Sequence, residues 1–327
     1  MTQEEMQEFE SLQPRLFALA YRMLGRVGDA EDVVQETYLR YERALERGTD
    51  VESPPAFLSA IVTRLSINEL KSARARHEVY VGEWLPEPIL TDEDDLRIDP
   101  AGHAEQADTL SLAFLVLLEQ LSPVERAVFL LHDVFGYEYG EIAETVGKSE
   151  ENCRQLATRA RRHIEAEKPR FEASRRERER LADRFFAAVG DGDVDELVEM
   201  LAADVVVYGN SDGKSPSWPR PIVGRDRVGR LFAGISRHLV EHEMRVERHE
   251  VNGQPGAMIV DKDGRIVNVM ALDIADGEIQ TVRSVINRNK LRHLGPLADV
   301  SDIRRGRRDA EDQASRRSGE PWGRPRS

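Results

Sequence analysis

Residues 139–163 read YGEIAETVGKSEENCRQLATRARRH, and this stretch decides the organisation of the chain. Residues 139–147 have the pattern of a short helix that ends at Gly147. Ser149 follows and is placed to cap a second helix. Two helices joined by a turn of three or four residues form a helix-turn-helix, which inserts its second helix into the major groove of DNA. The stretch therefore predicts a DNA-binding domain.

The second helix concentrates positive charge in an acidic chain. It carries four arginines and no acid between Asn152 and His163, whereas the net charge of the chain is −14. Basic residues late in a helix also complement the helix dipole, but the preceding helix and turn favour DNA binding. We expect the first side chains to reach base edges and the later arginines to hold phosphates. The expected DNA-binding set is Ser149, Asn152, Arg154, Gln155, Thr158, Arg159, Arg161 and Arg162.

Length and composition narrow the class of protein. The 327 residues suit two or three domains, and the single cysteine, Cys153, excludes an intrachain disulfide framework. The acidic N-terminus lacks the pattern of an export signal, and the apolar run 110–118 is too short to span a bilayer. We expect a cytoplasmic protein that binds no membrane, no cofactor and no metal ion.

The N-terminal half is expected to be helical. Residues 9–48 predict two helices broken near Gly25 and Gly28, and Ser53-Pro54 begins a third helix that runs from Ala56 to Arg76. Residues 77–108 contain ten acids and one base, which indicates an extended linker rather than a packed element. Helices resume at residue 106, and a capping box begins at Ser122. The predicted domains are 1–76 and 106–170, joined by an acidic linker over 77–105.

Two charged faces lie on the predicted N-terminal helices. Asp29, Asp32 and Glu36 form an acidic stripe at helical spacing, which we interpret as a surface for a protein partner. On the third helix, a basic face contains Arg64, Asn68, Lys71 and Arg74 and is suited to melted or single-stranded DNA.

The C-terminal part predicts a separate α+β domain over 175–294. A helix over 178–201 precedes a strand over 205–208, and the Asp263-Gly264 and Asp276-Gly277 dipeptides predict hairpins. The second turn sets Ile274 opposite Ile279 and Leu272 opposite Thr281. We expect the face with Val267, Val269, Ala271, Val282 and Ile286 to pack under a helix, and the other face, with Asn268 and Arg283, to line a cavity. Residues 295–327 have little to bury and are expected to be disordered.

Several of these segments, taken together, resemble one protein family. DAEDVVQETYLRY (residues 29–41) and the segment from Ser122 to Arg162 resemble bacterial sigma factors of the extracytoplasmic-function type. WLPEP (residues 84–88) and the segment after Tyr208 resemble the subgroup with a fused SnoaL-like domain. The resemblance implies a multidomain protein with two all-α sigma domains, the second with the helix-turn-helix, followed by a cone-shaped α+β domain.

The resemblance also implies roles for individual residues. Asp29, Asp32 and Glu36 would contact core RNA polymerase. The face with Arg64, Asn68, Lys71 and Arg74 would lie at the −10 element of promoter DNA, and the helix from Asn152 would read the −35 element. The residues implied to be regulatory are Trp84, Leu85, Pro86, Asp212, Gly213, Asn287, Lys290 and Leu291.

Three functions compete at this point. The first is an RNA polymerase sigma factor that its own C-terminal domain modulates, through a small molecule or an intramolecular ligand. The second is a stand-alone helix-turn-helix regulator, and the third is a SnoaL-like enzyme tethered to DNA. The acidic stripe favours the first, because a stand-alone regulator needs no polymerase-binding surface. His238, Asp212 and Asp273 are available for catalysis, but no spacing joins them into a dyad, so we expect no catalytic residue.

Overall fold

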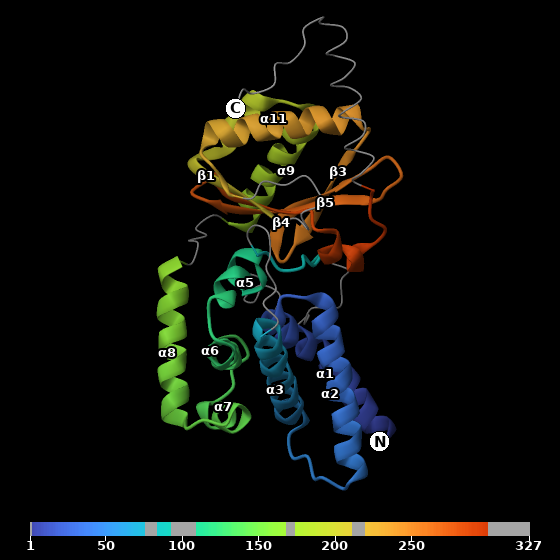
Figure 1. Cartoon of the computed structure of the whole chain (residues 1–327), viewed down its shortest axis with the longest axis vertical. Helices are drawn as coiled ribbons and strands as arrows, with labels where there is room; N and C mark the ends of the chain where they lie inside the picture. The colour runs from blue at the N-terminus through green and yellow to red at the C-terminus, as the bar shows by residue number, and fades with distance from the viewer. Residues whose placement is uncertain (1, 76–83, 93–108, 168–173, 211–219, 300–327) are drawn as a thin grey trace, which may run out of the picture.

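The computed structural model describes residues 2–75, 84–92, 109–167, 174–210 and 220–299 (Figure 1). A helical part contains the N-terminal half of the chain, and an α+β part lies beyond it along the long axis of the molecule. Several predictions fall on residues outside these ranges. They concern Asp212, Gly213, the predicted linker apart from residues 84–92, and the predicted tail from residue 300.

The first helical domain contains α1 (Gln3–Leu24), α2 (Val27–Glu46) and α3 (Pro54–Ala75). Gly25 ends α1 in the left-handed conformation, with φ of 68°, as the predicted break requires. Gly28 was also predicted to mark this break, but it lies in the first turn of α2. The helix predicted from Ala56 begins at Pro54, since proline is tolerated in a first helical turn.

The second helical domain contains α5 (Leu112–Glu119), α6 (Pro123–Phe129), the π-helical turn η2 (Leu130–Val134), α7 (Tyr139–Val146) and α8 (Glu150–Glu167). The predicted capping box at Ser122 is present, and Gly147 ends α7 with φ of 65°. The Ser149 hydroxyl accepts the Asn152 amide at 3.3 Å, as the predicted cap requires. The helix-turn-helix is confirmed in detail, and its core is continuous with that of the first helical domain.

The α+β domain contains three helices and a mixed six-stranded sheet within the part of the chain that is described. The helices are α9 (Arg175–Asp191), α10 (Val194–Met200) and α11 (Arg225–Glu241). The strands are β1 (Leu201–Asn210), β2 (Ile222–Val223), β3 (Arg245–Val251), β4 (Gln254–Val260), β5 (Ile266–Ala275) and β6 (Glu278–Val285), in the order β2-β1-β6-β5-β4-β3. Only β1 and β6 pair in parallel among these neighbours.

The single helix predicted over 178–201 is wrong, because two helices occupy this region. Gly192 ends α9 in the left-handed conformation, with φ of 77°. Asp193 then caps α10 by accepting the Glu196 amide at 3.0 Å. A glycine followed by a good N-cap residue stops one helix and starts another.

The predicted pairing of the last hairpin holds only next to its turn. Ile274 lies opposite Ile279 as predicted, but a β-bulge follows and Leu272 lies opposite Val282 instead of Thr281. The prediction for the two faces is right for Val267 and Val282, which pack on the helix side, and wrong for Val269 and Ala271. Met270, Leu272, Ile274 and Val282 pack with the helices, whereas the opposite face, with Val269, Ala271 and Val285, packs with residues of the linker and α5. Asn268 donates to Ser284 on the helix side, and Arg283 pairs with Asp273. Both faces of this sheet are covered, so the more uniformly apolar face does not identify the helix side.

The α+β domain extends past its predicted end at Leu294. The two short helical turns η3 (Arg288–Lys290) and η4 (Arg292–Leu294) follow β6. Leu297 then pairs with Ile266, and Ala298 is buried. In the described part of the chain, no helix is long and apolar enough to cross a membrane.

Candidate nucleic-acid interface and interdomain junction

Helix α8 presents an exposed polar face on the second helical domain. Arg154, Gln155, Thr158 and Arg159 line a shallow hollow of about 450 Å³ together with Glu151. The opposite side of the helix is buried, as predicted, and consists of Cys153, Leu156, Ala157 and Ala160. The arrangement leaves the predicted base-reading side chains Asn152, Arg154 and Gln155 exposed.

Three arginines of α8 have acidic partners within the protein. Arg154 lies 2.6 Å from Glu150 and 5.2 Å above the Tyr139 ring, yet more than half of its side chain is exposed. Arg161 pairs with Asp133 of η2 at 2.6 Å, and this hydrogen bond raises the pKa of Arg161. Arg161 would have to leave Asp133 to hold a phosphate. Arg159 lies 3.5 Å from Glu125 but remains exposed, as does Arg162.

The basic face of α3 contacts the helix-turn-helix. Arg64 donates from Nε to the Thr145 carbonyl at 2.9 Å and from Nη2 to the Glu144 carbonyl at 3.0 Å. These carbonyls lie in the last turn of α7, where a guanidinium complements the helix dipole. Asn68 and Lys71 are exposed on the same helix, and the Arg74 side chain lies outside the described part of the structure.

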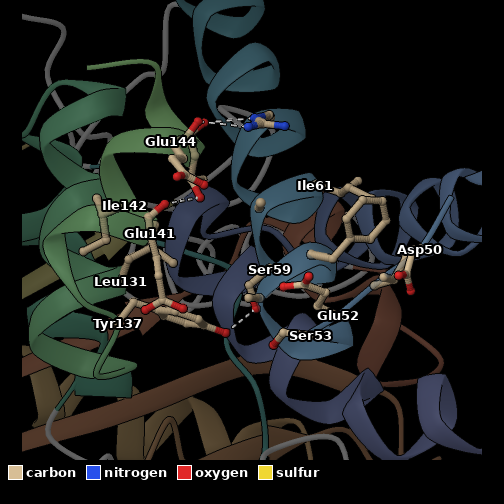
Figure 2. Close-up of a pocket in the computed structure, with 16 residues that line it drawn as sticks. Asp50, Glu52, Ser53, Ser59, Ile61, Leu131, Tyr137, Glu141, Ile142 and Glu144 are labelled. Carbon is tan, nitrogen blue, oxygen red and sulfur yellow. Dashed lines mark hydrogen bonds between the residues drawn. The ribbon is translucent and has the colours of Figure 1, made fainter. Parts of the chain in front are cut away.

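A cleft of about 440 Å³ lies between α3 and α7 (Figure 2). Ser59 and Tyr137, which both line it, are hydrogen-bonded at 2.7 Å, and Glu141 and Glu144 line it from the α7 side. The two helical domains are therefore closed on each other, with Arg64 bridging them.

The acidic stripe of α2 lies at the surface. Asp32 is exposed, Asp29 lies 3.6 Å from Arg26, and Glu36 pairs with Arg40 at 2.8 Å. Beside the stripe, α1 and α2 form a hollow of about 550 Å³ that Phe9, Pro14, Phe17, Val34 and Tyr38 line in part. Carboxylates next to an apolar hollow suit a protein partner that brings both basic and apolar side chains.

Five of the predicted regulatory residues lie at a junction between all three domains: Trp84, Leu85, Pro86, Lys290 and Leu291. The Lys290 ammonium donates to the Leu85 carbonyl and lies 5.1 Å from the Trp84 ring. Leu85 and Leu291 are buried in one hydrophobic cluster with the sheet. Gly25 lies against Trp84 so closely that a Cβ there would come within 2.6 Å of the indole. The linker segment 84–92 is therefore extended but packed, which corrects the prediction of an unpacked linker.

Asn252 also belongs to this junction, and the sequence analysis did not predict its role. It donates from Nδ2 to the Tyr21 hydroxyl at 2.9 Å and to the Leu110 carbonyl at 3.0 Å, and its Oδ1 accepts the Ile89 amide at 2.9 Å. Asn252 and Gly253 form the β3–β4 turn with φ of 52° and 70°. Asn-Gly is a strong hairpin signal, so the turn was detectable from sequence, but its contacts were not.

Glu87 of the linker joins the same network. Its carboxylate accepts the Val27 amide at 2.7 Å, and its carbonyl accepts the Tyr21 hydroxyl at 2.6 Å. Burial raises the pKa of Glu87, although the Val27 amide and Lys290 oppose this shift.

We expect Glu87→Gln to stabilise the protein at pH 7.5 and to lose this advantage toward pH 4.5. A carboxyl with a raised pKa in the folded state binds its proton more tightly there than in the unfolded chain, whose pKa is near 4.5. The contribution of the protonated Glu87 carboxyl to the free energy of unfolding is therefore complete below pH 4.5. It is lost as the pH rises through the raised pKa of the folded state. Thermal unfolding midpoints of both proteins across this range measure the difference. If the stability of the variant relative to wild type were lower at pH 7.5 than at pH 4.5, the raised pKa of Glu87 would be contradicted.

The three parts of the chain each match a protein-family model. Residues 9–76 match sigma-70 region 2, residues 111–164 match sigma-70 region 4, and residues 182–285 match the SnoaL-like domain. The curated ECF RNA polymerase sigma factor SigJ of Mycobacterium tuberculosis is 35% identical over 294 residues, which cover 88% of this chain and 93% of SigJ. The chain belongs to the ECF sigma factors. As such, it is a factor for promoter-specific transcription initiation.

Further relatives agree with this membership. The probable ECF RNA polymerase sigma factor SigI of M. tuberculosis is 34% identical over 280 residues, which cover 84% of this sigma factor and 91% of SigI. The crystal structure of M. tuberculosis SigJ superposes with a TM-score of 0.70 at 33% identity, and the match covers 90% of this sigma factor and all of that chain. The fold predicted for this sigma factor, with helical sigma domains followed by an α+β SnoaL-like domain, is confirmed.

Proposed function

We propose that this sigma factor binds core RNA polymerase through α2, reads promoter DNA with α3 and α8, and is modulated in cis by its SnoaL-like domain. The observation that carries the cis part is the Asn252 side chain, which bonds residues of region 2, the linker and the segment before region 4. One hairpin turn of the SnoaL-like domain thus bonds both helical domains' neighbouring segments, and we propose that these domains engage polymerase and promoter.

The exposed face of α8 supports direct reading of the −35 element. Gln155 and Arg154 lie in the first half of the helix, which is the part that meets base edges in a helix-turn-helix. Arg162 lies two turns later and suits a phosphate, which fixes register without reading sequence.

We expect Gln155→Ala to weaken binding to the preferred promoter by about 1–3 kcal/mol and to relax preference at one base pair. Arg162→Ala should weaken binding to all sequences alike and lower its salt dependence. Binding of the polymerase holoenzyme to a set of single-base promoter variants, measured at two salt concentrations, separates the two effects. A uniform loss for Gln155→Ala would show that this residue does not read a base.

The closed arrangement of the helical domains supports a conformational change on activation. Arg64 is proposed to contact the −10 element, yet in the closed form it bonds Thr145 and Glu144 of region 4. Region 2 and region 4 must therefore separate before α3 presents this arginine to DNA. A device that holds the domains together opposes promoter binding.

We propose that the ligand of the SnoaL-like domain is intramolecular and that the domain has no catalytic role. The sheet face opposite the helices packs with Leu85 and Leu90 of the linker and with Leu112 of α5. Asp273, one of the candidate catalytic acids, pairs with Arg283, and both side chains are largely buried. His238, another candidate, lies on the outer helix α11.

A further inference from the structure

The last turn of α11 brings together three side chains that can ligate a metal ion. One ligand atom each from His238, Glu241 and His242 lies within 4.8 Å of the others. The two imidazole rings are in contact, with centroids 4.2 Å apart and planes inclined by 66°. The cluster lies at the end of a helix on the side of the SnoaL-like domain that faces away from the sigma domains (Figure 1).

The sequence explains why the three side chains share one face. Positions i, i+3 and i+4 of a helix lie above one another, so His-x-x-Glu-His presents all three groups together. Gly234 lies one further turn back on this face, and a Cβ built there meets no atom within 4 Å. The space next to Gly234 on this face is therefore open.

The helix that carries the cluster is packed against the core of the SnoaL-like domain. The other side of α11 is buried in the domain core through Val228, Phe232 and Leu239. Helix α11 ends at Glu241 and His242 is its C-cap, so the negative end of the helix dipole lies at the cluster. The helix dipole favours a cation at this position, and the packing of α11 holds its ligands in place.

We propose that this turn of α11 binds one divalent transition-metal ion of the class of Zn²⁺, through His238, Glu241 and His242. Imidazole nitrogen is a preferred ligand of Zn²⁺, Co²⁺ and Ni²⁺, whereas Mg²⁺ and Ca²⁺ require oxygen ligands. Two histidines and a carboxylate leave the fourth position of a tetrahedral ion to water.

The bound ion acts on the stability of the SnoaL-like domain. It links the last helical turn of α11 to the residue that ends the helix, just before β3 begins at Arg245. A ligand that binds the folded domain and not the unfolded chain raises the unfolding temperature as its concentration increases. Zn²⁺ thereby stabilises the domain that docks on the linker, from the side of that domain that faces away from the sigma domains.

The test uses the full chain without a purification tag, after removal of metal by a chelator. We expect Co²⁺ to bind with one equivalent and to give the absorption of a tetrahedral site, and Zn²⁺ to displace it. His238→Ala and His242→Ala should each weaken Zn²⁺ binding by more than about tenfold, which is the least that loss of an outer-shell partner gives. His249→Ala is the matched control, because it removes a histidine that instead contacts Asp92 at 2.6 Å.

Two results would overturn the proposal. Equal Zn²⁺ affinity of the wild type and the His238→Ala/His242→Ala double variant would show that the ion binds elsewhere. An equal rise of the unfolding temperature with Mg²⁺ and Zn²⁺ would show that the imidazoles do not select the ion. Retention of folding by the variants is checked by their unfolding temperature without metal.

Discussion

Asn252→Gly should release the SnoaL-like domain from the sigma domains and raise promoter-dependent transcription. Glycine keeps the left-handed turn conformation but removes the bonds to Tyr21, Leu110 and Ile89. Leaving buried polar groups without partners costs about 3 kcal/mol in total, which shifts the docking equilibrium by roughly a hundredfold. Amide exchange at Ile89 should accelerate, and run-off transcription with core polymerase should increase.

Asp276→Gly is the control for this variant. Asp276 occupies the equivalent left-handed position of the β5–β6 turn, with φ of 53°, so the backbone change is the same. Equal transcription by the two variants would refute modulation through Asn252. Faster exchange at Ile89 without a change in transcription would leave docking intact as a structural feature and remove its regulatory role.

The double variant Asp32→Lys, Glu36→Lys should lose most of its affinity for core RNA polymerase. Charge reversal at two neighbouring positions of α2 replaces attraction to a basic partner by repulsion. We expect a loss of about 2–3 kcal/mol, or roughly 30- to 150-fold, with a smaller effect at high salt because the charges are at the surface. Affinity for core polymerase, measured by fluorescence anisotropy at two salt concentrations, gives the result.

Glu42→Lys, Glu46→Lys provides the matched charge change on the same helix. These residues have the same spacing and lie toward the C-terminal end of α2. Comparable losses for the two double variants would show a general effect of net charge rather than a specific surface. Unchanged affinity of the Asp32, Glu36 variant would contradict the assignment of the stripe.

Local signals predicted the helix-turn-helix and the caps around it. The turn of the helix-turn-helix, its Ser149 cap and the capping box at Ser122 each depend on residues at most a few positions apart, and the structure confirms all of them. The hairpin at Asp276-Gly277 follows from the same kind of signal, whereas the β-bulge beyond it does not. Such a bulge is decided by packing on both sheet faces, which no short window of sequence contains.

The sequence alone determined that two helical sigma parts precede an α+β part, and where the helix-turn-helix lies. Only the tertiary structure showed that Arg64 bonds region 4 and that the sheet face with Val269 and Ala271 packs on the linker. Asn252 and Tyr21 are 231 residues apart in the chain and meet through one hydrogen bond. Caps and turns are formed by residues that are neighbours in sequence, so they can be predicted from the sequence. Contacts across such distances form only when separately folded surfaces meet, and their partners are chosen by shape and burial.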